Sequence, residues 1–409
     1  MPMTIPLTHR RMIVFRGGQK SKVEGQRKKN KHMKFSTKAI HAGQSPDPTT
    51  GATIVPIYQT STFTQSGIGE HRGYEYSRSG NPTRKALEEN LSALENGKYG
   101  LSFASGLAAE HAILAVLKPG DHVIAMQDMY GGTYRLFEKV FAPNGIRFTY
   151  VDAHPASFSD AVRPETRLVW IESPTNPLLQ IVDIGSLVDI CKSKNLLLVV
   201  DNTFATPFFQ NPLDLGADLV VHSTTKYLGG HSDVIGGAVI TNNEEWYEKI
   251  RFLQNAAGGV SSPFDCWLTL RGIKTLAIRM KQHEENAFAV ARFLSTHKQV
   301  KEVIFPGLPE HPDYDLAKRQ MSGFGGMLSF KIYGGFEEAN RIMKKFRIYS
   351  LAESLGGVES LANYPAVMTH GSIPAEMRQK IGVTDDLIRL SVGIEDAEDL
   401  IADLEAALA

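Results

Sequence analysis

The sequence has few cysteines, no long hydrophobic run and no dinucleotide-binding fingerprint, and each of these absences excludes a class of protein. Two cysteines, Cys191 and Cys266, are too few for a disulfide framework, and no Cys/His spacing indicates a metal site. No apolar run approaches the roughly 18 residues of a membrane-spanning helix. No G-x-G-x-x-G motif marks a Rossmann dehydrogenase. We therefore expect a soluble protein of a reducing cytoplasm that binds neither a metal nor a membrane.

The net charge of zero conceals an uneven distribution of charge. Residues 1–34 carry ten Lys or Arg side chains and one acid, Glu24, which gives them a net charge of +9 and leaves −9 for the rest of the chain. We expect this segment to be a disordered leader, or the product of a start set upstream of a true first residue at Met33. A presequence or a nucleic-acid-binding arm is the alternative. The acidic remainder argues against nucleic acid as the main partner.

Hydrophobic patterning predicts an α/β protein with a second, smaller domain. Helical patterns at 85–96, 107–117, 134–141 and 184–193 alternate with short apolar runs at 122–126, 148–151, 168–171, 196–200 and 219–222. Such runs indicate a mainly parallel sheet covered on both faces, which binds ligands beyond the carboxyl ends of its strands. An amphipathic stretch at 263–297 predicts one bridging helix. Strands at 303–305, 327–332 and 387–392 and a helix at 397–408 follow.

The chain of 409 residues is too long for one compact core, and these patterns divide it into four parts. We predict a leader at 1–34, an N-terminal arm at 35–76, an α/β domain at 77–270 and a C-terminal α+β domain at 271–409.

Two neighbouring strand ends carry the residues best suited to bind a cofactor and take part in catalysis. Asp201 follows the apolar run 196–200, and Lys226 follows the run 219–222 after Ser223 and two threonines. A pyridoxal-phosphate site needs this pair, because a lysine forms the Schiff base and an acid keeps the pyridine nitrogen protonated. An exposed ion pair is the alternative interpretation.

The same cofactor requires donors for its phosphate and a partner for its ring. Ser105-Gly106-Leu107 opens a predicted helix, whose first N–H groups can bind phosphate, although an ordinary helix cap has the same pattern. The hydroxyls of Ser223 and Thr225 can add to this site. Tyr130 lies at a strand-to-helix turn and can stack on the ring, or act as acid or base if nearby cations lower its pKa. A surface tyrosine is the alternative.

Five motifs in order resemble the Cys/Met-metabolism family of pyridoxal-phosphate enzymes. They are YEYSRSGNPT at 74–83, ASGLAA at 104–109, ESPTNP at 172–177, STTKY at 223–227 and LAESLGG at 351–357. The resemblance runs from about Ser36 to the C-terminus. It implies the aspartate-aminotransferase-like type I fold, a homotetramer of two tight dimers, an amino-acid substrate and pyridoxal 5'-phosphate as cofactor.

The resemblance also implies a role for individual residues. Lys226 would form the Schiff base, Asp201 would face the pyridine nitrogen and Tyr130 would stack on the ring. The expected phosphate ligands are Gly106, Leu107, Ser223 and Thr225, joined by Tyr76 and Arg78 from the neighbouring subunit. The expected substrate-binding residues are Glu75, Arg135, Asn176, Glu353, Ser354 and Arg389, of which Arg389 would clamp the α-carboxylate as a bidentate fork.

Within the family, several positions favour γ-elimination from cystathionine. Glu353 resembles the glutamate of γ-lyases and γ-synthases, whereas enterobacterial β-lyases carry an aromatic residue there. Gly132 stands where methionine γ-lyases have cysteine. Glu75 and Arg135 resemble residues that recognise the distal amino-acid end of cystathionine, or else are surface charges. We expect cleavage to cysteine, 2-oxobutanoate and ammonia. The first alternative is γ-replacement on an O-acylhomoserine by cysteine, followed by β-cleavage of cystathionine and γ-cleavage of methionine.

Overall fold

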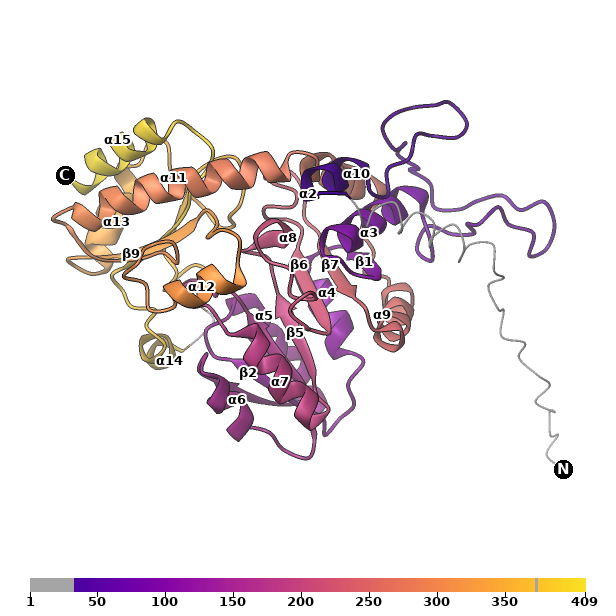
Figure 1. Ribbon diagram of the computed structural model, residues 1–409, viewed down its shortest axis with the longest axis horizontal. Coiled ribbons are helices and arrows are strands. Elements are labelled where there is room, and N and C mark those ends of the chain that lie inside the picture. The colour runs from indigo at the N-terminus through magenta and orange to yellow at the C-terminus, as the bar shows by residue number, and fades with distance from the viewer. Residues whose placement is uncertain (1–32, 372–373) are drawn as a thin grey trace. The chain divides into compact units, whose positions relative to one another are not determined.

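The computed structural model describes residues 33–371 and 374–409. The chain divides into two units, Met1–Lys34 and Phe35–Ala409, and the helices and strands of the described residues belong to the second (Figure 1). The predicted leader, apart from Met33 and Lys34, lies outside the described residues. Within the described part of the chain, no helix is both long enough and apolar enough to cross a membrane.

A seven-stranded sheet and the helices around it form the larger part of this unit. The elements are α2 (Phe35–His41), α3 (Pro82–Leu94), β1 (Tyr99–Phe103), α4 (Gly106–Leu114), β2 (His122–Met126), α5 (Gly131–Leu136), a π-helical turn (Phe137–Phe141), a 3-10 turn (Ala142–Asn144), β3 (Arg147–Val151), α6 (Pro155–Asp160), β4 (Thr166–Glu172), α7 (Ile184–Lys194), β5 (Leu197–Asp201), α8 (Thr206–Phe209), β6 (Leu219–Ser223), β7 (Gly237–Thr241) and α9 (Glu244–Ala257). The strand order is β1-β7-β6-β5-β4-β2-β3.

The sheet is parallel except for β7, which runs antiparallel to both β1 and β6. Its strands are buried on both faces. Leu219 and Val221 of β6 belong to one hydrophobic cluster, and Val220 between them belongs to another. Because alternate side chains of a strand point to opposite faces, the two clusters pack against the two sides of the sheet. This arrangement confirms the predicted α/β fold with a mainly parallel, doubly covered sheet.

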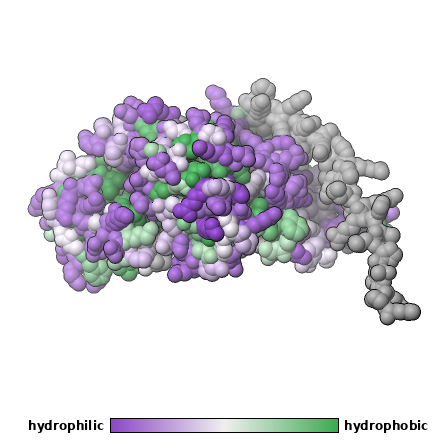
Figure 2. Space-filling model, turned by 90° about the horizontal axis from the view of Figure 1, so that it is seen from below, coloured by the Kyte–Doolittle hydropathy of each residue, from purple (hydrophilic) through white to green (hydrophobic). Residues whose placement is uncertain are grey.

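A second, five-stranded sheet forms the smaller part. It follows α10 (Pro263–Ile273) and α11 (Leu276–Thr296) and contains β8 (Val300–Ile304), α12 (Tyr314–Gln320), β9 (Met327–Ile332), α13 (Phe336–Lys345), β10 (Ser350–Leu351), β11 (Leu361–Asn363), α14 (Ala375–Lys380), β12 (Leu387–Ser391) and α15 (Ala397–Leu408), with strand order β10-β11-β12-β9-β8. Residues of α11, α13 and α15 share a core with β9 and β12. The domain boundary near residue 270 stays a prediction. Figure 2 shows mixed hydrophilic and smaller hydrophobic areas on one face of the molecule.

The single bridging helix predicted at 263–297 is wrong, because the helix breaks at Lys274 and Thr275. At the break the carbonyl of Gly272 does not take part in a regular helical bond. It accepts hydrogen bonds from Thr275 Oγ1 at 3.1 Å and Arg279 Nη2 at 2.9 Å instead. Gly272 also packs closely, since a Cβ there would lie 2.0 Å from the carbonyl oxygen of Gly229. Amphipathic periodicity continues across such a break, so the sequence pattern gave no sign of it.

Candidate active site

Lys226 lies in the turn that follows β6, and its amine is half-buried. Its Nζ donates a hydrogen bond to Ser354 Oγ at 2.7 Å. Arg279, buried in α11, donates to the carbonyl of Tyr227 at 2.8 Å and so holds the turn from the other side. Burial lowers the pKa of Lys226 to about 8, with the charge of Arg389 adding to the effect and that of Glu353 opposing it. A substantial share of this amine is therefore neutral near physiological pH, as a nucleophile or base requires.

Asp201 ends β5 beside this turn. It pairs in register with Val221 of the parallel strand β6, so the two predicted strand ends do lie together. Its Oδ1 accepts a hydrogen bond from the Thr203 N–H at 2.9 Å, and the Thr203 hydroxyl accepts from the Ser223 N–H at 2.9 Å. Burial raises the pKa of Asp201, against the opposing effects of Thr203 and His222. A cation placed beside the carboxylate would lower this pKa again.

Arg389, on β12, is the third charged residue of this site after Lys226 and Asp201. It is 1% exposed, and its guanidinium donates from Nη1 to Asn176 Oδ1 and from Nη2 to the Ser354 carbonyl, both at 2.8 Å. Nε is buried without a partner, and no carboxylate of the described residues forms an ion pair with the group. Burial lowers the pKa of Arg389 to about 10. A buried cation with a free donor is suited to bind an anion such as a carboxylate.

Ser354 joins Lys226 to Arg389, since its hydroxyl accepts from one and its carbonyl from the other. Its backbone has φ of 90°, a conformation that costs a non-glycine residue of order 1–3 kcal/mol. Strain of this kind persists where surrounding contacts impose it. Here the contacts are those to the lysine and the arginine.

Tyr130 begins the turn into α5, and its ring lies over Gly132. A Cβ at position 132 would lie 2.3 Å from the Cε1 atom of this ring, so only glycine fits in this arrangement. The sequence left open whether nearby cations lower the pKa of Tyr130, and in this structure they do not lower it overall. Burial raises it, and the opposing charge of Arg135 does not outweigh that effect. The phenol therefore keeps its proton at neutral pH.

Two residues that the sequence did not single out hold the loops of this site. Glu172, the last residue of β4, accepts the Tyr130 N–H at 3.0 Å, and burial together with the charge of Asp201 raises its pKa well above the usual range. Glu172 follows the predicted strand 168–171, and this position at the end of a strand could have identified it as a site residue. His370, whose Nε2 lies 3.0 Å from the Asn176 carbonyl oxygen and 3.2 Å from that of Met129, comes from a distant segment and gave no local signal.

The start of α4 faces Ser223 at the end of β6. Ser105 caps the helix by accepting the Ala108 N–H at 3.0 Å, and helix geometry offers no internal acceptor to the N–H groups of Gly106 and Leu107. A Cβ on Gly106 would lie 3.1 Å from the Ser223 Cβ, so the glycine permits this approach. The hydroxyl of Thr225 donates to the Gly236 carbonyl and accepts its N–H. The Thr225 hydroxyl is therefore engaged within its own loop, while the free N–H groups of Gly106 and Leu107 beside Ser223 form a neutral cradle suited to phosphate.

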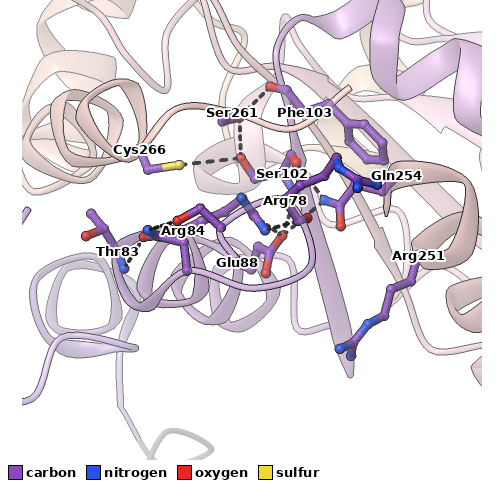
Figure 3. A network of polar contacts seen from close by, with 12 residues as sticks. Arg78, Thr83, Arg84, Glu88, Ser102, Phe103, Arg251, Gln254, Ser261 and Cys266 are labelled. Atoms are coloured by element: carbon purple, nitrogen blue, oxygen red, sulfur yellow. Dashed lines mark hydrogen bonds and ion pairs between the residues drawn. The ribbon is translucent and has the colours of Figure 1, made fainter. Parts of the chain in front are cut away.

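The contacts of the described residues do not join Tyr76, Arg78, Glu75 or Arg135 to Lys226. Arg78 Nη1 donates to the Asn255 carbonyl at 2.6 Å, and its own carbonyl accepts from Arg84 Nη2 at 3.1 Å. Figure 3 shows how Arg84, Glu88, Ser102 and Gln254 connect this segment to β1 and α9. Glu75 pairs with His71 at 3.2 Å, and Arg135 is exposed on α5.

A phosphorylated aldehyde with a basic ring nitrogen fits these residues. Lys226 offers an amine of lowered pKa, Asp201 a carboxylate for the nitrogen, and the start of α4 a cradle for the phosphate. Such a site on an aspartate-aminotransferase-like fold defines a pyridoxal-phosphate-dependent enzyme. Among the residues that the structure describes, no group of three His, Cys, Asp or Glu side chains is placed to hold a metal ion.

Comparison with known proteins shows to which family of pyridoxal-phosphate-dependent enzymes the chain belongs. The chain belongs to the family described as Cys/Met metabolism PLP-dependent enzymes, whose model matches residues 36–409. The resemblance drawn from the five motifs, and the cofactor it implies, are thereby confirmed.

Relatives of this family carry three different names at nearly equal similarity. The chain is 55% identical to a cystathionine gamma-lyase of Dictyostelium discoideum, with 92% of this chain and 98% of the relative covered. It is 54% identical to a cystathionine gamma-synthase of Mycobacterium bovis (91% and 96% covered) and 53% identical to a cystathionine beta-lyase of Coxiella burnetii (93% and 99% covered). The crystal structure of a cystathionine gamma-lyase from Lactobacillus plantarum matches with a TM-score of 0.90 at 49% identity, covering 92% of this chain and 98% of that one.

Proposed function

We propose that this protein acts as a cystathionine γ-lyase, converting cystathionine and water to cysteine, 2-oxobutanoate and ammonia. The observation that carries the proposal is the position of Glu353. Its carboxylate precedes Ser354 and is close enough to influence the pKa of Lys226, Arg389 and Tyr130. An exposed anion beside a site that holds one amino-acid carboxylate suits a substrate with a second, distal ammonium group.

Bound pyridoxal phosphate supplies the electron sink that makes the Cα proton of an amino acid removable. Arg389 binds the substrate α-carboxylate through its free donors, while Asn176 and Ser354 keep the guanidinium in place. The neutral amine of Lys226 takes the Cα proton, and a second proton must leave Cβ before the bond from Cγ to sulfur can break. Tyr130, protonated at neutral pH, stands as the acid that donates a proton to the departing sulfur.

Gly132 agrees with this assignment and disfavours a methionine γ-lyase. A cysteine at this position would collide with the Tyr130 ring as it is placed here.

γ-Replacement on an O-acylhomoserine by cysteine is the second candidate. It is favoured by a relative of nearly equal identity that bears the name cystathionine gamma-synthase. Both reactions use the same base, the same carboxylate clamp and the same first proton transfer, so the residues of this site serve either.

A product assay separates these activities. Cystathionine, O-succinylhomoserine with cysteine, and methionine are offered separately, and the products are identified by mass spectrometry. We expect cysteine and 2-oxobutanoate from cystathionine at the highest kcat/KM. Formation of cystathionine from O-succinylhomoserine as the fastest reaction would instead assign the protein as a synthase. Homocysteine and pyruvate would assign a β-lyase.

We further propose a homotetramer of two tight dimers in which Tyr76 and Arg78 serve the phosphate site of the neighbouring subunit. Two observations support this arrangement. The Tyr76 side chain is exposed, with the Arg78 guanidinium 5.5 Å from its ring centroid. Arg78 and Arg84 also line a hollow with Ser61, Ser77 and residues 260–263, in which no acid takes part. Such a basic surface hollow suits an anion that another chain presents.

Replacing Arg78 with lysine is expected to weaken cofactor retention although the charge is kept, because lysine lacks the planar fork that binds two phosphate oxygens. The dissociation constant of pyridoxal phosphate, measured by equilibrium dialysis, is expected to rise several-fold. Arg72→Lys changes a nearby arginine that does not line this hollow; it is the control and is expected to bind normally.

Mixing an Arg78→Ala protein with a Lys226→Ala protein is expected to restore activity. In a hybrid dimer one site carries both defects, while the other combines an intact Lys226 with an intact Arg78. Random exchange of an equal mixture would recover roughly a quarter of the activity of the unaltered enzyme. If native mass spectrometry confirms subunit exchange and activity stays at the level of the parents, Arg78 acts within its own chain or not at all.

A further inference from the structure

One buried carboxylate joins the two strand ends of the site from the far side of the sheet. Glu95 is the first residue after α3, and its side chain is 1% exposed. Its Oε1 accepts a hydrogen bond from Asn202 Nδ2 at 2.8 Å and lies 2.5 Å from His222 Nε2. With Glu95 as the carboxylate, this contact assigns a proton to Nε2 of the imidazole.

The two partners of Glu95 are the neighbours of the predicted cofactor residues. Asn202 directly follows Asp201. His222 directly precedes Ser223 and stands four positions before Lys226. Since Asp201 and Val221 are register partners, their side chains share one face of the sheet, and His222 points to the other.

The backbone pairing between β5 and β6 ends close to this point, although β6 stays paired with β7 as far as Ser223. The paired residues of β5 and β6 end at Asp201 and Val221, followed by one further bond from the Asn202 N–H to the Val221 carbonyl at 3.0 Å. Beyond it the connections are made by side chains. Thr203 binds Ser223 on the side of the site, and Glu95 binds Asn202 and His222 on the opposite side.

We propose that Glu95 is a positioning residue of the cofactor site, which fixes the spacing between Asp201 and Lys226 by binding Asn202 and His222 at once. This inference rests on the placement of the cofactor between those two residues that is proposed above. Glu95 does not touch the cofactor. It acts through the ends of β5 and β6. Its loss is expected to change the distance between Asp201 and Lys226, so that the apo-protein no longer contacts the ring nitrogen and the aldehyde carbon of one cofactor molecule equally well.

The burial of this group explains why its partners matter. A carboxylate removed from water needs hydrogen bonds to replace those of its hydration shell, and removing one partner leaves a charge that the interior does not stabilise. The Nδ1 atom of His222 is buried and has no hydrogen-bond partner among the described residues, so Glu95 is the group that holds this ring. Pairing with β7 holds the backbone of His222 and Ser223, but without Glu95 the His222 ring can rotate and its link to Asn202 of β5 is lost.

The test compares two replacements of His222 that differ in one hydrogen bond. His222→Gln keeps an N–H donor at the position of Nε2, whereas His222→Ala removes it. The dissociation constant of pyridoxal phosphate from the apo-protein is measured by quenching of tryptophan fluorescence, and the visible circular dichroism per bound cofactor reports its geometry. We expect His222→Ala and Glu95→Gln to raise the dissociation constant at least tenfold and to weaken the dichroism. His222→Gln is expected to stay within about threefold of the unaltered protein, a difference of less than 1 kcal/mol.

Asp403→Asn provides the matched control for general destabilisation. Asp403 is also a buried carboxylate and accepts backbone N–H groups of Arg347, Ile348 and Tyr349 far from the site, so its replacement lowers the melting temperature without moving the strand ends. If the variants at positions 95 and 222 lose only thermal stability, as Asp403→Asn does, the positioning role is wrong. Lys226→Ala in the same assay separates the two proposals. If Lys226→Ala retains covalently bound cofactor, the proposed site itself is wrong. If Lys226→Ala loses the cofactor while Glu95→Gln and His222→Ala bind it as the unaltered protein does, only the role of Glu95 is wrong.

Discussion

Replacing Lys226 with alanine is expected to abolish the visible absorbance of the covalently bound cofactor and to reduce turnover by at least about 10³-fold, since one group supplies both the Schiff base and the base that takes the Cα proton. The amine is positioned for both tasks by Ser354 and by the turn that Arg279 holds. Absorption spectra of the purified variant and a 2-oxobutanoate assay measure the two losses.

Borohydride reduction followed by peptide mapping identifies the modified lysine directly. Label is expected on the peptide that contains Lys226. Lys301→Ala serves as the control, because this lysine pairs with Asp386 at the second sheet and its loss leaves the label in place. Label on any other lysine would show that the assignment of Lys226 is wrong.

The lowered pKa of Lys226 gives the binding reaction a characteristic pH dependence. Only the neutral amine attacks the aldehyde, so the rate at which the apo-protein binds the cofactor rises with pH and is expected to reach half its maximum near pH 8 rather than near 10.5. The Glu353 carboxylate raises this pKa, so Glu353→Gln is expected to shift the midpoint to lower pH. A shift to higher pH would contradict the position given to Glu353.

Replacing Asp201 with alanine is expected to reduce turnover by at least about a hundredfold while part of the bound cofactor's colour is retained. In the proposed site the Asp201 carboxylate keeps the pyridine nitrogen protonated. Without it the Schiff base with Lys226 still forms, but the ring accepts electrons poorly. Steady-state kinetics and absorption spectra of the same preparation measure the two effects separately.

Asp218→Asn is the matched control for Asp201. Asp218 lies at the opposite end of the same pair of strands and accepts the Leu198 N–H at 2.9 Å, so its replacement disturbs β5 without reaching the site. Near-normal turnover in Asp201→Ala would falsify the pyridinium role. Equal losses in both variants would point to damage of the sheet instead.

Much of the fold was predictable because local pattern and global structure agree in this chain. The apolar runs that became β2 and β9 have the predicted bounds, and the closing helix coincides with α15. β1 and β7 were not predicted. Each carries glycine in a short run, and their antiparallel pairing depends on partners far along the chain.

The strand ends of the site were predictable for a physical reason. A buried apolar run that stops at an acid or a hydroxyl marks the edge of a sheet, and adjacent parallel strands bring such edges together. Asp201 and the turn to Lys226 lie at neighbouring strand ends as this argument predicts. The roles of Tyr76, Arg78, Glu75 and Arg135 depend on a second chain or a bound substrate, and they stay predictions.

The sequence by itself determined the family, the cofactor, the alternation of helices and parallel strands between residues 107 and 222 and the pair of strand ends, since each of these depends on short motifs or on the period of apolar residues. Only the tertiary structure decided the protonation of Tyr130 and the contacts of Ser354, Arg389, Glu172 and Glu95. A pKa depends on burial and on nearby charges from other segments, and a buried hydrogen bond depends on which atoms the packed chain brings within about 3 Å. Neither quantity is present in the local order of residues.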